Sequence, residues 1–549
     1  MNKILILILL VAALFRFVGI TQSPPALNWD EASIGYNAYS ILKTGKDEWG
    51  EFLPLNFRAF GEQKLPGMIY ASIPGIAIFG LNDFGVRVTP ALLGVLSVYL
   101  IYLLAYKIFA KKELALASAF LLAISPWAVH FSRVAFEAGL ALALTLLSLY
   151  FLVLAGSKPK YYWLSLIFAI FALYTYNSVR ILLPLLLFAY LINGVIKFTG
   201  KTKKTLLLVL VVGFVLSLPI LFSLATKEGR VRWGTLSIMS QKSFVDDIAE
   251  SRGYTTLPSI LPRLIHNKPT HFVYKFLHNY ISTFSSEFLF LKGSSNTQRS
   301  VQEMGLLYLF ELPLLVVGLF ELGSKGGSKI SKASKIIMPL FLLAPVPSAL
   351  TIDAPSSVRT LSLLPALILV ESLGFIKLTR WFAGKKLVVR AVVVGFVLWS
   401  ISYFAYKLWF VYPKKYADDW AYGYKQAYSW VYSQYASVDN IYITSKYGEP
   451  HIFALFYGQI DPKLYHSYDV KYSTDPLGWI HVYSFDKFHF TGFTGLETSE
   501  EIQARIPGKS LLLTSFAILP NDLKREYELK APNWKVMFEG TLIDGEVSN

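Results

Sequence analysis

The sequence predicts an α-helical membrane protein that crosses the bilayer about 11 times and carries a C-terminal α/β domain outside the membrane. Three observations support this fold class. Eleven apolar runs come close to the roughly 17–25 residues that a hydrocarbon core of about 30 Å requires. The chain of 549 residues is 54% hydrophobic and only 16% charged, whereas a typical soluble domain is about 25% charged. The net charge also changes sign, from +20 over residues 1–411 to −4 over residues 412–549.

The apolar runs follow one another through residues 1–411, which we interpret as one transmembrane domain. The predicted spans cover residues 3–20, 85–109, 114–130, 134–155, 160–175, 179–197, 204–224, 304–322, 335–351, 358–377 and 388–411. Arg16 interrupts the first run and no small-residue cleavage motif follows it, so we expect a span rather than a cleaved signal peptide. The apolar stretch 66–80 is short and contains proline and glycine, which favours an interfacial helix.

The distribution of basic residues predicts the orientation of these spans. If the N-terminus is cytoplasmic, the inside segments contain 19 Lys and Arg residues. The short outside turns then contain only Arg133, Arg180 and Arg359. The positive-inside rule therefore predicts a multi-pass protein of the plasma membrane whose external regions are loops 21–84 and 225–303 and domain 412–549. The overall charge of +16 thus reflects topology and contact with membrane lipids, and we expect no nucleic-acid partner.

The C-terminal domain is predicted to begin near Tyr412 and Pro413, where the charge balance changes. Residues 416–436 show the spacing of a helix with an aromatic face, and residues 440–444 and 510–514 are typical of buried strands. The chain contains no cysteine, which excludes disulfides, thiolate zinc sites and cysteine nucleophiles.

The first external loop carries Asn28-Trp29-Asp30-Glu31 at the start of a predicted helix that runs to Thr44. Asp30 is well placed as the N-cap of this helix. Carboxylates in a first turn also interact favourably with the helix dipole. Taken alone, such a pair is more often a helix cap than a catalytic site.

Further ionisable side chains occur at the other turns on the same side of the membrane. Such residues at membrane depth are costly and usually functional, although an arginine at the end of a span often only reaches toward the headgroups. The histidine in this set could equally be an interfacial residue without contact to substrate. The candidates are Glu62, Lys64, Arg87, His130, Arg133, Glu137 and Arg359.

Carboxylates and cations on one face of a membrane domain suit a reaction between an anionic lipid and a neutral nucleophile. Lysine and arginine hold phosphate through charge-assisted hydrogen bonds, and a carboxylate can accept the proton of an attacking hydroxyl or amine. Glycosyl transfer from a phosphate needs both groups, because the leaving phosphate gains negative charge in the transition state. A divalent cation held by Asp30 and Glu137 is the candidate cofactor, since such ions prefer oxygen ligands.

The chain resembles membrane glycosyltransferases of the GT-C fold, especially the aminoarabinose–lipid A transferases and the protein O-mannosyltransferases. The resemblance rests on four motifs, which are Asp30-Glu31, Lys64-x-Pro66, Asn82-x-Phe84-Gly85-Val86-Arg87 and Arg133-x3-Glu137. It implies a polyprenyl-phosphate-linked sugar as donor, a lipid, glycan or protein as acceptor, and transfer on the extracytoplasmic face.

The resemblance also implies roles for individual residues. Asp30 corresponds to the base, Glu31 accompanies it, Lys64 holds the donor phosphate, and Glu137 is the second acidic position. By the same resemblance, Arg133 and Arg359 are further contacts to the phosphate or the sugar. Residue type and position alone make Glu62, Arg87 and His130 candidates for binding substrate.

Two departures from the family pattern concern the same motifs. Relatives have a contiguous Glu-Lys-Pro where this chain has Glu62-Gln63-Lys64-Leu65-Pro66, and they often have aspartate where this chain has Glu137. The identity of the acid that partners Lys64 therefore stays open.

Two other function classes are compatible with the same pattern. A transporter for lipid-linked saccharides would need ionisable residues near the middle of the bilayer. An oligosaccharide ligase or polymerase of the same architecture would differ in how many sugars it transfers. The centres of the predicted spans contain almost no Asp, Glu, Lys or Arg, which favours an enzyme that acts at the interface.

Overall fold

The structure is a computed structural model that describes all residues except 1, 62, 199, 226–233, 241, 255–259, 325–327, 476–478, 494 and 546–549. Its contacts divide the chain into two compact units. The helical unit contains Met1–Arg16, Leu92–Ser132 and Glu137–Ala405. The sheet unit contains Phe17–Ala91, Arg133–Phe136 and Tyr406–Asn549. The first external loop thus groups with the C-terminal domain, whereas loop 225–303 groups with the helices.

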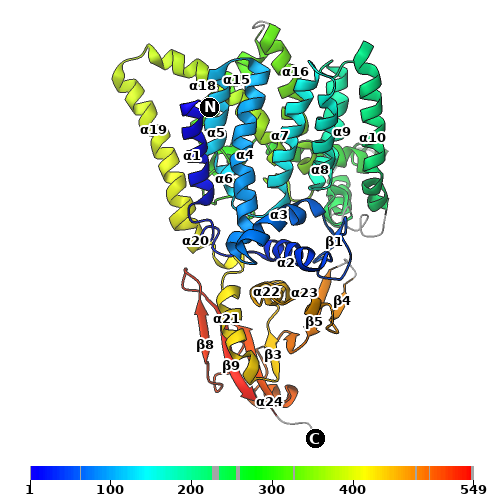
Figure 1. Ribbon diagram of the computed structural model, residues 1–549, viewed down its shortest axis with the longest axis vertical. Coiled ribbons are helices and arrows are strands. Elements are labelled where there is room, and N and C mark those ends of the chain that lie inside the picture. Colours follow the sequence, from blue (N-terminus) through cyan, green and yellow to red (C-terminus); the bar gives the residue numbers. More distant parts are fainter. Residues whose placement is uncertain are drawn as a thin grey trace. The chain divides into compact units, whose positions relative to one another are not determined.

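The helical unit consists of apolar helices and of loop 225–303, which lies between α10 and α15 in the chain (Figure 1). Its apolar helices are α1 (Lys3–Phe17), α4 (Asp83–Phe109, within this unit from Leu92), α5 (Lys112–Ile124), α7 (Glu137–Ala155), α8 (Tyr161–Leu173), α9 (Asn177–Ile192), α10 (Gly200–Ala225), α15 (Glu311–Gly323), α16 (Ser328–Leu343), α18 (Leu364–Ala383) and α19 (Leu387–Tyr406). Its other elements are α6 (Pro126–Phe131), η1 (Ile238–Ser240), α12 (Lys242–Gly253), α13 (Ile260–Ile265), α14 (Lys268–Ser282), η2 (Glu287–Leu291), α17 (Val346–Ala349) and η3 (Leu361–Leu363).

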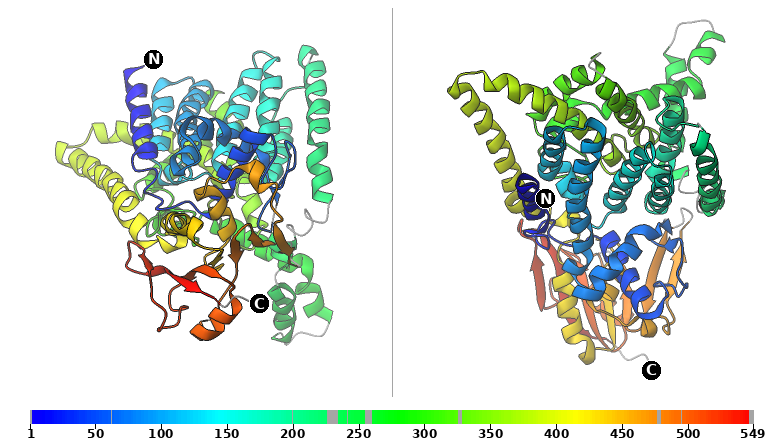
Figure 2. Two further views of the ribbon diagram at one scale, coloured as in Figure 1. Left: turned by 60° about the horizontal axis from the view of Figure 1, so that its bottom comes forward. Right: turned by 45° about the horizontal axis from the view of Figure 1, so that its top comes forward.

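Each predicted span contains one of the apolar helices, so the predicted helical membrane architecture is confirmed. Six helical segments in the described part of the chain are long and apolar enough to cross a membrane. Within the most apolar part of each segment, 78% of Leu361–Ala383 is buried in the protein, compared with 17% of Thr202–Phe222 and 11% of Leu387–Lys415. Helix α18 is therefore central to the helical unit, and α10 and α19 lie at its margins (Figure 2).

Helix α18 packs closely against α15 through two glycines. A Cβ atom at Gly318 would lie 2.0 Å from the carbonyl oxygen of Val370, and one at Gly374 would lie 2.0 Å from that of Leu314. The backbones therefore approach as closely as small residues allow, as is common between membrane helices. Glu311 and Glu371, on these same helices, are fully buried.

The sheet unit begins with the first external loop. This loop forms α2 (Trp29–Thr44), the two-stranded ladder β1 (Phe57–Arg58) and β2 (Gln63–Lys64), and α3 (Pro66–Phe79). Helix α3 occupies the stretch predicted as an interfacial helix, and Pro66 is its first residue, a position where the missing N–H costs nothing.

The C-terminal part of the sheet unit is the predicted α/β domain. Its helical elements are η4 (Lys407–Val411), α20 (Tyr412–Lys415), η5 (Asp418–Trp420), α21 (Tyr424–Gln434), η6 (Tyr435–Ser437), α22 (Pro450–Tyr457), α23 (Pro462–Tyr465) and α24 (Ser499–Arg505). Its strands are β3 (Asn440–Ile443), β4 (Lys471–Thr474), β5 (Ile480–Phe485), β6 (Phe488–Phe490), β7 (Lys509–Ser515), β8 (Tyr527–Lys530) and β9 (Val536–Asp544).

These strands form one mixed sheet in the order β4-β5-β6-β3-β7-β9-β8. Strand β3 runs parallel to β6 and β7, and the other neighbours are antiparallel. The aromatic face predicted for 416–436 belongs largely to α21, where Tyr424 stacks on Phe453 of α22 at a centroid distance of 4.2 Å. That face therefore forms part of the core of the domain.

Candidate active site

The carboxylates of Asp30 and Glu31, in the first turn of α2, have different surroundings. Asn28 is the N-cap, where its side chain accepts a hydrogen bond from the Glu31 N–H, and the Glu31 side chain accepts one from the Asn28 N–H. The predicted cap at Asp30 is therefore wrong, because the reciprocal capping box is built by Asn28 and Glu31. Asp30 is left with its side chain 41% exposed.

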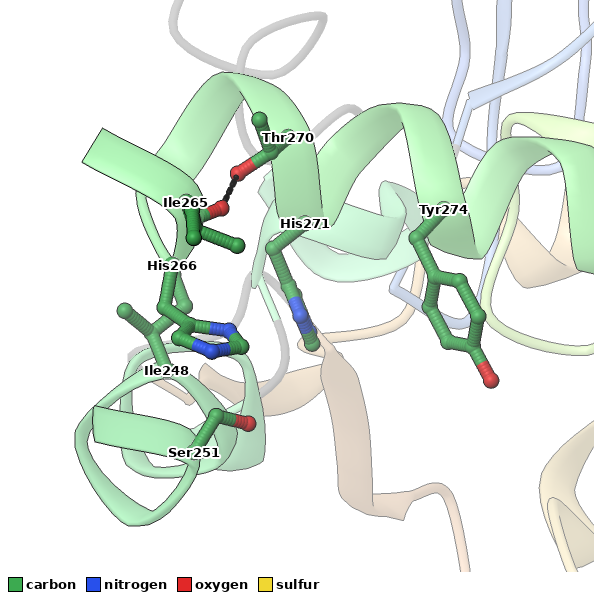
Figure 3. A pocket seen from close by; sticks show the side chains of 7 residues that line it. All are labelled: Ile248, Ser251, Ile265, His266, Thr270, His271 and Tyr274. Carbon is green, nitrogen blue, oxygen red and sulfur yellow. Dashed lines mark hydrogen bonds between the residues drawn. The ribbon is translucent and has the colours of Figure 1, made fainter. Parts of the chain in front are cut away.

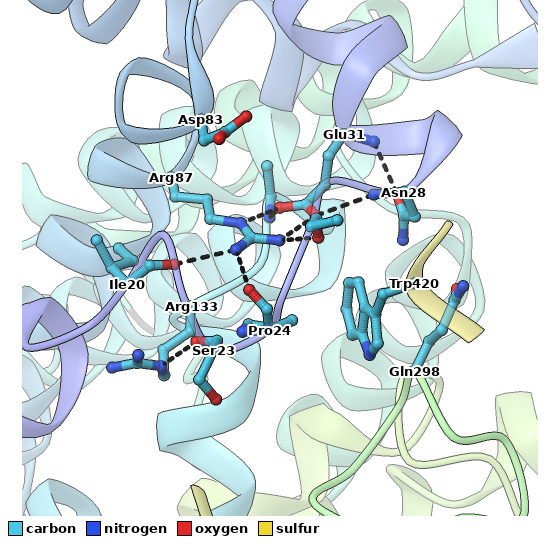
Figure 4. A network of polar contacts seen from close by, with 12 residues as sticks. Ile20, Ser23, Pro24, Asn28, Glu31, Asp83, Arg87, Arg133, Gln298 and Trp420 are labelled. Atoms are coloured by element: carbon cyan, nitrogen blue, oxygen red, sulfur yellow. Dashed lines mark hydrogen bonds and ion pairs between the residues drawn. The ribbon is translucent and has the colours of Figure 1, made fainter. Parts of the chain in front are cut away.

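Glu31 is fully buried and ion-paired with Arg87 of α4 (Figure 4). Arg87 Nε and Nη2 donate to the two carboxylate oxygens of Glu31 at 2.9 and 2.8 Å, and the Ala135 N–H donates to the same carboxylate at 3.1 Å. Each oxygen of Glu31 thus has at least two donors. This bidentate geometry is the strong form of the arginine–carboxylate pair.

The two buried arginines of the sheet unit bind mainly backbone carbonyls. Arg87 donates to the carbonyls of Ile20, Pro24 and Ala26 at 2.5–3.0 Å. Arg133 donates to the carbonyls of Ser23, Val18 and Gly19 at 2.7–2.9 Å. Both arginines are 0% exposed. They hold residues 18–26, the segment that leads into α2.

Asp30 and Lys64 form a second ion pair next to this buried network. Lys64 Nζ lies 2.9 Å from Asp30 Oδ1 and 3.4 Å from the Asp30 carbonyl oxygen. The same ammonium lies 4.9 Å from the centre of the Phe60 ring. The Lys64 side chain is only 2% exposed. The pair therefore joins an accessible carboxylate to a cation that is otherwise shielded from water.

A third cluster lies within the helical unit and centres on Asp353. Arg299 Nη1 lies 2.8 Å from one oxygen of Asp353, and Arg359 Nη1 contacts the other. Burial raises the pKa of Asp353, but the hydrogen bonds and charges of the two arginines outweigh it and lower the pKa to about 2. The three side chains are 13–32% exposed, so two cations share one carboxylate at an accessible position.

Two other predicted residues also belong to the helical unit. Glu137 is the first residue of α7. Burial raises the pKa of Tyr176 above its ordinary value. The charges of Arg359 and Arg299 oppose this increase, and the charge of Glu137 adds to it. His130 is 1% exposed and its Nε2 lies 2.9 Å from the Gln298 carbonyl oxygen. Arg359 and Glu137 therefore share one electrostatic environment.

Sequence reasoning missed Arg299 and Asp353. Asp353 lies in the same turn as Arg359, between two predicted spans, and that spacing was the available signal. Arg299 carries no such signal, because it lies far away in the chain at the end of loop 225–303. Glu62 lies outside the described residues. No group of three or more His, Cys, Asp and Glu side chains suited to a metal ion occurs in the described part of the chain.

A cavity of about 400 Å³ lies among α12, α13 and α14 (Figure 3). Its polar lining includes His266, His271 and Tyr274. None of the predicted site residues lines this cavity, so it is distinct from the three clusters above.

Comparisons with known proteins bear on the fold. Residues 66–222 match the sequence profile of the dolichyl-phosphate-mannose-protein mannosyltransferase family. The structure matches that of ArnT from Cupriavidus metallidurans bound to undecaprenyl phosphate, with a TM-score of 0.54, 13% identity and 97% of each chain covered. The chain has the GT-C fold.

Other matches cover less of the proteins concerned. An uncharacterized protein of Aquifex aeolicus is 32% identical over 163 residues, which are 28% of this chain and 33% of that protein. The oligosaccharyltransferase AglB of Archaeoglobus fulgidus matches with a TM-score of 0.47 and 15% identity, over 83% of this chain and 63% of that one. The chain thus spans less than two thirds of both proteins. With its GT-C fold and its apolar helices, it is a multi-pass membrane protein.

Proposed function

We propose that this protein is an inverting glycosyltransferase. It moves a sugar from a polyprenyl-phosphate donor to a lipid, glycan or protein acceptor on the extracytoplasmic face of the plasma membrane. The observation that carries this proposal is the accessible Asp30 carboxylate held 2.9 Å from the shielded Lys64 ammonium. The fold shared with ArnT, which was solved with undecaprenyl phosphate, supports the class of donor.

Asp30 is the proposed general base. Its carboxylate is 41% exposed, whereas both oxygens of Glu31 are occupied by buried donors. An acceptor hydroxyl or amine attacks the anomeric carbon, and Asp30 takes its proton as the bond to the donor phosphate breaks. The products are the glycosylated acceptor and the polyprenyl phosphate. We assign Glu31, together with Arg87 and Arg133, to holding the site rather than to the chemistry.

Lys64 is the proposed partner of the donor phosphate. An ammonium has three N–H bonds, and among the described residues Lys64 directs them at the carboxylate and carbonyl of Asp30. These two contacts leave one N–H bond of the ammonium, and we propose that a phosphate oxygen meets it when the bound donor takes the place of the groups that now cover this 2% exposed side chain. This hydrogen bond and the positive charge stabilise the negative charge that develops on the leaving group.

Arg359 and Arg299 are proposed as further contacts to the donor. Two guanidinium groups bound to a single carboxylate keep a net positive charge, and planar guanidinium forks match phosphate geometry. Asp353 keeps both arginines oriented. In this proposal Glu137 and His130 contact the acceptor or the sugar.

The test is a transfer assay with purified full-length protein in lipid nanodiscs. Polyprenyl-phosphate sugars are offered together with lipid, glycan and peptide acceptors, and products are identified by mass spectrometry. We expect Asp30→Asn to lower turnover by about 10²–10⁴-fold, the range for removal of a general base. Lys64→Ala is expected to lower turnover strongly as well.

The matched control is Lys535→Ala. Lys535 pairs with Asp418 at 2.6 Å in the C-terminal domain. The variant therefore removes a lysine–aspartate ion pair that involves none of the predicted site residues. We expect this variant to keep full activity. Wild-type turnover that persists in both Asp30→Asn and Lys64→Ala would refute the proposed roles.

The alternatives predict other products in the same assay. A ligase or polymerase would attach a preformed chain or many sugars to one acceptor, whereas the proposed enzyme attaches one. A transporter would move the lipid-linked sugar across the bilayer of a proteoliposome without forming any product.

A further inference from the structure

The C-terminal domain contacts both segments that carry the Asp30–Lys64 pair. We propose that this domain sets the distance between the two side chains, with Gly448, Trp479 and His451 as positioning residues. The catalytic consequence rests on the function proposed above, but the positional claim does not. All contacts involved lie within the sheet unit.

The first contact holds the residue next to Asp30. Gly448, just before α22, has φ +109°, and a Cβ atom there would lie 2.5 Å from the ring of Trp29. The Trp29 ring therefore lies directly on the backbone of Gly448. One turn or more further along α2, Gly35 lies as closely against the Phe456 ring of α22, since a Cβ atom there would lie 2.6 Å from that ring. Helix α2 thus contacts the C-terminal domain at two points, Gly448 just before α22 and Phe456 within α22.

The second contact holds the loop that leads to Lys64. Gly61 has φ +94°, and a Cβ atom there would lie 2.5 Å from the indole of Trp479. Its neighbour Phe60, whose ring faces the Lys64 ammonium, meets the imidazole of His451 edge-on at a centroid distance of 5.7 Å. Phe60 and Gly61, which precede Lys64 in the chain, are therefore each contacted by a ring of the C-terminal domain.

The third contact is a row of alternating imidazoles and carboxylates. His451 Nε2 lies 3.7 Å from Glu48, its Nδ1 lies 3.8 Å from Glu449, and Glu449 in turn lies 3.8 Å from His481. At the far end, His481 Nε2 lies 3.9 Å from Asp475. His451 is 1% exposed, and neither ring nitrogen has a hydrogen-bond partner among the described residues.

This row ties the first external loop to α22. Glu48 is held from the other side by Asn37 of α2, whose side-chain amide donates to Glu48 at 2.8 Å and accepts from the Glu48 N–H at 3.0 Å. Burial raises the pKa of Glu449, while His451 and His481 lower it. His451 of α22 thus lies between Glu48 of the first external loop and Glu449, and its ring packs against Phe60 near Lys64.

Asp30 lies in α2 and Lys64 in β2, which are separated in the chain by residues 45–62. Their 2.9 Å separation therefore depends on how α2 and β2 are each held in place. A displacement of about 1 Å at a reacting group can cost about 10²-fold in rate. The C-terminal domain thus acts on catalysis through the positions of Asp30 and Lys64.

The test compares Gly448→Ala with Gly508→Ala in the full-length protein in nanodiscs. Both glycines have positive φ and both lie in the C-terminal domain. A Cβ atom at Gly508 would meet Asp439 at 2.8 Å, away from α2 and residues 60–64. An alanine is more strained at φ +109° than at φ +63°, so Gly508→Ala controls for a Cβ atom added at positive φ in this domain, and only Gly448→Ala displaces Trp29.

Two measurements are made on each variant. One is the transfer rate, where we expect Gly448→Ala to lower kcat by about 10–100-fold with little change in KM for the donor. The other is the rate at which an amine reagent labels Lys64, followed by mass spectrometry, which needs no activity. We expect labelling to be several-fold faster in Gly448→Ala and unchanged in Gly508→Ala.

A second pair of variants guards against misfolding. Trp479→Leu removes the ring over Gly61, and Trp534→Leu removes an 83% exposed ring of the same domain. Equal Lys64 labelling in Trp479→Leu, Trp534→Leu and wild type would overturn the proposal. A wild-type protein that transfers no sugar would refute the proposed function alone, because the labelling comparison would still decide the positional claim.

Discussion

At the scale of single residues, two neighbouring carboxylates have opposite surroundings. Glu31 is enclosed by Arg87, the Asn28 N–H and the Ala135 N–H, whereas Asp30 faces outward beside Lys64. A fully paired carboxylate cannot accept a substrate proton without losing a buried hydrogen bond. This difference is the reason to assign chemistry to Asp30 and support to Glu31.

Replacement of Arg87 tests that assignment. Arg87→Met leaves the Glu31 carboxylate buried without its cation, which typically costs about 3–5 kcal/mol. We expect a large drop in thermal stability in detergent. The double variant Arg87→Met/Glu31→Leu removes both charges and is expected to recover most of that stability. Transfer activity in the double variant would confirm that Glu31 and Arg87 only support the site. A well-folded but inactive double variant would contradict that role.

At the scale of elements, the contact between α15 and α18 is set by two glycines. Gly318 and Gly374 each lie against a carbonyl of the opposite helix, so the pair is closed by backbone contact rather than by side chains. Glu371, on the same stretch of α18, is fully buried and both its oxygens lack a hydrogen-bond partner among the described residues. This helix pair therefore combines close packing with a costly buried carboxyl group.

A methyl group at this contact should separate the helices. In Gly374→Ala the new Cβ atom would lie 2.0 Å from the Leu314 carbonyl oxygen, and such overpacking typically costs about 1–3 kcal/mol. Gly395→Ala in α19 is the control, because nothing lies within 4 Å of its added Cβ. Thermal unfolding in detergent should show a lower midpoint for Gly374→Ala only. Equal midpoints for the two variants would contradict the packing argument.

At the scale of the whole molecule, the fold shared with ArnT and the apolar helices agree with the predicted membrane architecture. The orientation rests on the basic residues of the inside turns. Because the chain contains no cysteine, each introduced thiol is unique. This makes the orientation directly measurable.

We expect Ser433→Cys in the C-terminal domain to react with a membrane-impermeant maleimide in intact cells. Ser157→Cys, in a turn predicted to be cytoplasmic, should react only after the cells are permeabilised. Both serines are exposed, so a difference in labelling reports the side of the membrane. The reverse pattern of labelling would show that the predicted orientation is wrong.

Most of the fold could be predicted from the sequence because its signals are local. Apolar runs of sufficient length form helices wherever they insert, and the helix at Trp29–Thr44 and the strands at 440–443 and 509–515 follow from equally local patterns. The candidate site was predicted in part. Asp30, Lys64 and Arg359 stood out as charges in an apolar chain, but which charges pair could not be read from their order.

The sequence by itself determined the class of protein: a chain with so few charges, most of them between long apolar runs rather than within them, must be a membrane protein with interfacial polar sites. Only the tertiary structure decided the roles within the site. Asn28 rather than Asp30 caps α2, Arg87 closes on Glu31, and Arg299 joins Arg359 on Asp353. The reason is that pairing and burial depend on distances between segments far apart in the chain, and these distances exist only once the helices and the sheet have packed.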